Sequence, residues 1–72
     1  MKATTIIFLL GQSRLALSVA HKGRHLPAKY LVRAIYYAQD EARRRGVPYL
    51  GIAGRATEVS TRQDGSVEVY TL

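Results

Sequence analysis

The sequence predicts a small α+β domain, ββαββ in chain order, in which an antiparallel sheet of about four strands packs against one long helix. Three observations support this prediction. Short apolar or alternating segments lie at both ends, a single long amphipathic segment lies between Pro27 and Gly46, and turn-forming residues separate the segments. With 72 residues and no cysteine, the chain is predicted to be a single compact domain, residues 1–72, without a disulfide framework.

The first two elements are predicted to form a hairpin. Residues 3–10 are rich in β-branched and large apolar side chains, which favours a strand. Residues 14–20 alternate between apolar and polar or small side chains, as a half-buried strand does. Residues 11–13 between them are turn-forming, so the two strands are expected to pair with each other.

The first strand is apolar on both of its faces. Ile6, Phe8 and Leu10 point one way, whereas Ile7 and Leu9 point the other way. One helix can cover only one of these faces, and a large exposed apolar patch is a liability. We therefore predict a homodimer formed through the sheet.

A helix is predicted over residues 27–45. Pro27 suits its first turn, Gly46 suits the position after its end, and Pro48 prevents its continuation. At 100° per residue the apolar side chains fall on one side. These are Ala28, Leu31, Ala34, Ile35, Ala38 and Ala42.

The last third of the chain is predicted to return to the sheet. Residues 49–52 suit either a short strand or a packed loop, and Gly51 and Gly54 suit a bulge or a close approach of the backbone to the helix. Residues 55–62 and 66–72 alternate well. Gln63, Asp64 and Gly65 between them form a strong turn signal, so we expect a second hairpin.

Positive charge is concentrated in residues 21–45. This segment holds seven basic and two acidic residues, which gives it five of the chain's six net positive charges. Such a surface favours an anionic partner, and tyrosines beside arginines can stack on bases while the cations meet phosphates. The candidate binding residues are Lys22, Arg24, Lys29, Arg33, Tyr36, Tyr37, Arg43 and Arg44.

The same charges also fit a solvated helix face with no partner. Asp40 has the spacing to pair with Arg44, and Glu41 has the spacing to pair with Arg45. Basic residues in the last turn also suit the negative end of the helix dipole. These local pairs would lower the charge available for binding at this end of the helix.

We predict a small, non-enzymatic basic module that binds nucleic acid through this helix face. The alternative is an inhibitor or adaptor of the kind that phages and other mobile elements encode, which would use the same face to block a larger host protein or nucleoprotein complex. The partner is then nucleic acid or an acidic protein surface, with no small-molecule substrate and no membrane. The five-residue apolar run at 6–10 is shorter than a signal peptide requires, so a cytoplasmic location is expected.

Catalytic and metal-binding signatures are weak. The carboxylates are dispersed, and Asp40 and Glu41 diverge by 100° on a helix, so they form no acid/base pair. His21 and His25 have a helical metal-ligand spacing, but Gly23 and Pro27 make a continuous helix through both unfavourable. A nuclease that uses His21 or His25 as its base is the enzymatic alternative. We expect no enzyme, no metal and no cofactor.

Overall fold

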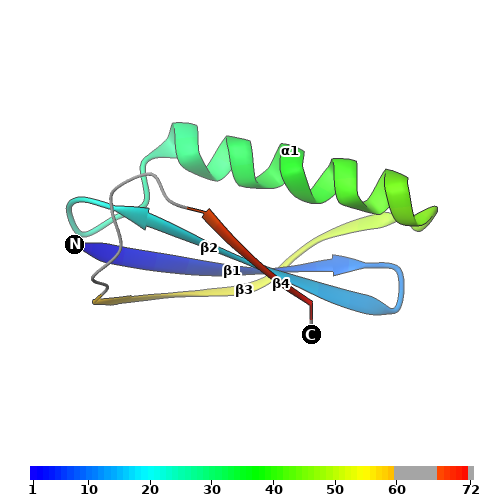
Figure 1. Ribbon diagram of the computed structural model, residues 1–72, viewed down its shortest axis with the longest axis horizontal. Coiled ribbons are helices and arrows are strands. Elements are labelled where there is room, and N and C mark those ends of the chain that lie inside the picture. The colour runs from blue at the N-terminus through cyan, green and yellow to red at the C-terminus, as the bar shows by residue number, and fades with distance from the viewer. Residues whose placement is uncertain (60–66, 72) are drawn as a thin grey trace.

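A computed structural model of the chain describes the backbone of residues 1–59 and 67–71, and the side chains of residues 1–59. The elements are β1 (Lys2–Leu10), β2 (Ser13–His21), α1 (Ala28–Arg45), β3 (Tyr49–Val59) and β4 (Val67–Thr71). All strand pairs are antiparallel, and the order in the sheet is β3-β1-β2-β4. The helix lies across one face of the sheet (Figure 1). The predicted α+β class, with antiparallel strands and one helix, is confirmed.

The predicted hairpin of β1 and β2 is confirmed. Leu10 pairs with Ser13, and the Ser13 hydroxyl donates a hydrogen bond of 2.9 Å to the Leu10 carbonyl oxygen. Gly11 occupies the turn with φ +60, and its N–H donates to the carbonyl oxygen of Pro48 at 2.8 Å. A Cβ at Gly11 would lie 3.0 Å from the Cβ of Val47. The hairpin turn is thus packed closely against the segment that follows the helix.

The helix occupies almost the whole range predicted for it. Pro27 is its N-cap, so the missing N–H of proline leaves no helical hydrogen bond unmade. Gly46 ends the helix in the left-handed conformation, φ 69 and ψ 32. Its N–H bonds to the Arg43 carbonyl, and the N–H of Val47 bonds to the Ala42 carbonyl, as in a Schellman motif.

Small side chains hold α1 against the sheet. Ala34, Ala38 and Ala42 are buried, and Leu31 and Ile35 are half-buried. Their partners from β1 and β2 are Ile6, Phe8, Leu10, Leu15 and Leu17, all fully buried. Because alanine projects only one carbon, the helix can lie close to these large side chains.

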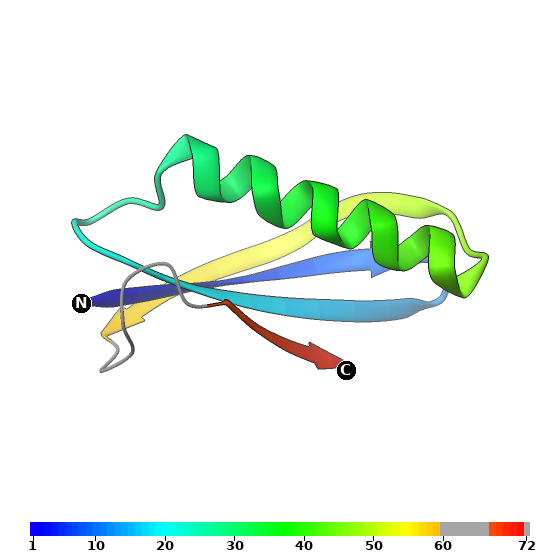
Figure 2. The ribbon, with the colours of Figure 1, turned by 45° about the horizontal axis from the view of Figure 1, so that its top comes forward.

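The expectation that Ala28 is buried was wrong, since this residue is exposed. The physical reason is the inclination of α1. Its C-terminal end approaches the sheet, whereas its N-terminal end stands away from it (Figures 1 and 2). The first turn of the helix therefore has no sheet surface directly against it.

β3 is one continuous strand of 11 residues rather than a short segment followed by a second strand. Two register shifts against β1 leave Leu50 and Ala53 as extra residues. The bulge predicted around Gly51 is confirmed, and Gly51 has φ +106. The alternative, a close backbone approach, is not found there, because a Cβ at Gly51 or Gly54 would meet nothing within 4 Å.

The hairpin predicted between the last two strands was wrong. β3 pairs with β1 and β4 pairs with β2, so the two lie on opposite edges of the sheet. Alternation shows that a segment suits a strand, but it does not select the neighbour. Residues 60–66, with the predicted turn at Gln63, Asp64 and Gly65, and residue 72 lie outside the described residues.

The sheet face opposite α1 is also apolar. Ile7 and Leu9 of β1 lie on this face and are half-buried, and Ala3 and Ala16 beside them are buried. The predicted division of β1 into two apolar faces is confirmed. The homodimer expected from it stays a prediction.

Candidate nucleic-acid interface

The outer face of α1 brings together six of the eight predicted binding residues. Because Ala34, Ala38 and Ala42 face the sheet, the residues on the opposite side of the helical wheel face away from it. The exposed residues on this outer face are Lys29, Arg33, Tyr36, Tyr37, Arg43 and Arg44. Tyr36 is 63% exposed and Tyr37 is 40% exposed, so both rings are accessible to a partner.

Lys29 and Arg33 share an aromatic neighbour, Tyr30, that the sequence prediction missed. The Lys29 Nζ lies 5.4 Å from the centroid of the Tyr30 ring, and the Arg33 Cζ lies 5.9 Å from it. Both distances suit cation–π interactions. The available sequence signal was the i, i+3 spacing of Tyr30 and Arg33.

No ion pair neutralises these two cations within the part of the chain whose side chains are described. Tyr30 is half-buried and so provides a fixed platform for both. The N-terminal half of α1 therefore presents two adjacent positive charges that a phosphate can meet without displacing a carboxylate.

The C-terminal half of the face is different, because its arginines have carboxylate partners. Arg43 pairs with Asp40 at 3.1 Å, and Glu41 accepts from both Arg44 at 2.6 Å and Arg45 at 3.0 Å. The predicted Glu41–Arg45 pair is confirmed. The predicted Asp40–Arg44 pair was wrong, because Arg44 reaches the nearer Glu41 at i−3.

These pairs leave the C-terminal half open to an anionic ligand. The pair of Asp40 and Arg43 is highly exposed, and exposed ion pairs contribute only about 0–1 kcal/mol. A hollow of about 430 Å³ is lined by Tyr37, Asp40, Arg43 and Arg44. An arginine in this half can release its carboxylate partner and bind a phosphate instead, at a small cost in free energy.

The two remaining predicted residues, Lys22 and Arg24, are exposed in the loop at the N-terminal end of α1. The loop begins at Lys22, because His21 is the last residue of β2 and is fully buried. Its Nε2 lies 2.7 Å from Thr4 Oγ1. His21 is therefore enclosed in the sheet, which argues against its role as the base of a nuclease.

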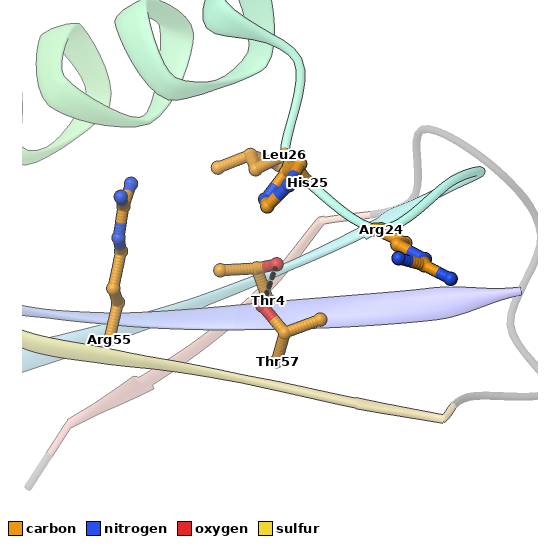
Figure 3. Close-up of a pocket in the computed structure, with 6 residues that line it drawn as sticks. All are labelled: Thr4, Arg24, His25, Leu26, Arg55 and Thr57. Carbon is orange, nitrogen blue, oxygen red and sulfur yellow. Dashed lines mark hydrogen bonds between the residues drawn. The ribbon is translucent and has the colours of Figure 1, made fainter.

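A second cluster, which the sequence did not predict, lies between this loop and β3. A cavity of about 140 Å³ is lined by Thr4, Arg24, His25, Leu26, Arg55 and Thr57. Figure 3 shows Thr4 and Thr57 at its floor, Arg55 and Arg24 to either side, and His25 and Leu26 above. We call this cluster the loop pocket.

The register explains how β3 contributes to the loop pocket. Arg55 pairs with Ile6 and Thr57 pairs with Thr4, so both stand on the helix side of the sheet. Alternation in the sequence could have placed Arg55 and Thr57 on one face. It could not place them beside a loop about thirty residues earlier in the chain.

Among the described residues no group of three metal-ligating side chains gathers, and no helix has the length and hydropathy needed to cross a membrane. Comparison with protein-family models, with curated proteins and with solved structures found no match. The function is therefore argued from the geometry of the site.

Proposed function

We propose that this protein is a small, non-enzymatic module that binds nucleic acid through the outer face of α1, with Lys22 and Arg24 extending the surface. The observation that supports this best is the arrangement of Lys29 and Arg33. Both are exposed, both contact the Tyr30 ring, and neither forms an ion pair with a described residue. Tyr36 and Tyr37 lie on the next turn of the same face.

The mechanism is mainly neutralisation of backbone phosphates. A helix of 18 residues is roughly 27 Å long, so cations at both of its ends can meet phosphates several nucleotides apart. The exposed tyrosine rings add stacking on unpaired bases, which tolerates any sequence because every base has an aromatic face. The expected behaviour is strong salt dependence with little sequence preference.

The test is fluorescence anisotropy with labelled single-stranded and duplex oligonucleotides over a series of salt concentrations. The logarithm of affinity should fall linearly with the logarithm of salt, by about 0.9 per neutralised phosphate on duplex DNA and about 0.7 on single strands. Affinity that does not change with salt would contradict the proposal.

A matched pair of variants tests the face itself. Arg33→Gln removes one positive charge from α1, whereas Arg14→Gln removes one from an exposed residue of β2 on the opposite sheet face. We expect Arg33→Gln to weaken binding and to lower the salt slope by about one phosphate, with a smaller effect for Arg14→Gln. Equal effects would show that only net charge matters.

One observation favours the alternative, an inhibitor or adaptor directed at a protein. Val32 is 47% exposed and lies one turn before Tyr36 on α1, beside Arg33. An aliphatic side chain next to Tyr and Arg suits a protein interface better than a phosphate backbone. A partner retained in stoichiometric amount after nuclease treatment, and lost in Val32→Ser but not in Val59→Ser, would favour this alternative.

A further inference from the structure

We propose that the loop pocket binds a single phosphate group. This inference goes beyond the proposed function, because the outer face of α1 contributes no residue to the pocket and only Arg24 is shared with the predicted surface. The pocket lies near the N-terminal end of α1, which stands away from the sheet (Figures 2 and 3).

The charge of the lining selects an anion. Three basic residues, Arg24, Arg55 and His25, line the pocket, and no acidic residue does. Glu58 of β3 pairs with Ala3 and so stands on the opposite face of the sheet. Neither guanidinium forms an ion pair with any residue whose side chain is described. An anion between these cations would relieve their mutual repulsion.

The helix end adds to this preference. No acidic residue lies in the first turn of α1, and no side chain caps its N-terminal N–H groups. The partial positive charge of a helix N-terminus therefore acts in the same direction as the arginines and the histidine.

The floor of the pocket is a partly buried chain of hydrogen bonds across three strands. Thr4 Oγ1 lies 2.7 Å from Nε2 of His21 and 2.8 Å from Oγ1 of Thr57. The other imidazole nitrogen, Nδ1, lies 3.3 Å from the carbonyl oxygen of Lys22, which can only accept. Nδ1 therefore carries a proton.

The direction of this chain depends on the second nitrogen of His21. When the imidazole is neutral, Nε2 accepts from Thr4, and Thr4 in turn accepts from Thr57, which uses the Thr57 proton. When His21 is protonated, Nε2 donates to Thr4, Thr4 donates to Thr57, and the Thr57 hydroxyl is free to donate into the pocket. Protonation of His21 thus adds a hydrogen-bond donor to the phosphate site.

The described charged groups around His21 are all basic, so together they favour a bound anion. Lys2 is opposite His21 on β1, and Lys22 follows it in the chain. Arg24 and His25 come from the loop, Arg55 comes from β3, and the first turn of α1 holds no acidic residue. A phosphate in the pocket supplies the negative charge that this cluster lacks.

The experiment is a titration of ¹⁵N-labelled protein with inorganic phosphate at constant ionic strength, with chloride as the exchanged anion. We expect saturable shifts of the amide signals of Thr4, Arg24, His25, Arg55 and Thr57. Arg55→Gln should weaken phosphate binding roughly tenfold, because a charge-assisted hydrogen bond is lost. Arg14→Gln, on the sheet face opposite the helix, should leave phosphate binding unchanged.

A hydroxyl variant tests the hydrogen-bond chain. Thr57→Val keeps the shape of an exposed side chain and should weaken binding, whereas Thr5→Val on the opposite sheet face should not.

Two oligonucleotides of one sequence, with and without a 5′-phosphate, separate the sources of the phosphate group. Tighter binding of the phosphorylated one, abolished by Arg55→Gln but not by Arg14→Gln, assigns the pocket to a nucleic-acid end. Equal binding of both, with saturable inorganic phosphate binding, assigns it to a small phosphate compound. Shifts that do not saturate, or that persist in Arg55→Gln, overturn the inference and leave the proposed role of α1 to its own test.

Discussion

The hydroxyl of Thr4 and the imidazole of His21 form a fully buried hydrogen bond of 2.7 Å between neighbouring strands. Thr57 extends it to the edge strand β3 at 2.8 Å, so one polar chain joins β2, β1 and β3. The hydrophobic core lies nearer the other end of the sheet, where Leu10 and Ala42 are buried. These linked hydrogen bonds therefore fix the strand register at the end of the sheet that the helix does not closely cover.

Thr4→Val should destabilise the protein by about 1–3 kcal/mol, because it leaves a buried imidazole nitrogen without its partner. Thr5→Val is the control. Thr5 is half-buried, and its hydroxyl is 3.4 Å from that of Ser18, a weaker contact. Urea unfolding followed by circular dichroism measures both. Equal stability of the two variants would show that the hydrogen-bond chain contributes nothing to the stability of the fold.

Gly11→Ala should destabilise more than Gly23→Ala. Both glycines have positive φ, so each alanine has a backbone penalty of about 1–2 kcal/mol. The Cβ at Gly11 also meets Val47 Cβ at 3.0 Å, whereas nothing lies within 4 Å of a Cβ at Gly23. Thermal unfolding of the two variants measures the contribution of the close packing at the hairpin turn. An equal loss of stability in both variants would contradict that contribution.

Ala38→Leu should destabilise the fold by about 1–3 kcal/mol, because a larger side chain would push the helix off the sheet. Ala38 is fully buried against the core. Ala28→Leu makes the same change at an exposed position of the same helix and should shift stability by no more than about 0.5 kcal/mol. A destabilised Ala28→Leu variant would contradict the inclination of α1 described above.

Local signals in the sequence predicted the helix and the first hairpin well. Pro27 and Gly46 act within one turn of the helix ends, and the turn at Gly11 joins neighbouring strands, so each prediction needed only nearby residues. The pairing of β4 with β2 rather than β3 depends on the whole sheet. The exposure of Ala28 likewise depends on the tilt of α1, which helical periodicity does not contain.

Local sequence patterns likewise predict one candidate site and miss the other. The outer face of α1 follows from a helical wheel, and all its predicted residues are exposed as expected. The loop pocket joins Arg24 to Arg55, which are brought together only by the antiparallel pairing of β3 with β1. His21 ends β2 through its pairing with Lys2, a long-range relationship that its sequence neighbours do not indicate.

Asp40→Asn should tighten nucleic-acid binding with little effect on stability. It frees Arg43 from an exposed ion pair whose loss costs at most about 1 kcal/mol. It also removes a negative charge from the outer face of α1, so affinity at low salt should rise and the salt dependence should steepen.

Glu58→Gln is the matched control for this change. It removes the same charge from an exposed residue of β3, on the sheet face opposite the helix. Anisotropy titrations of both variants with one oligonucleotide compare them directly. If Glu58→Gln tightens binding as much as Asp40→Asn, then the overall charge of the protein, rather than the outer face of α1, determines affinity.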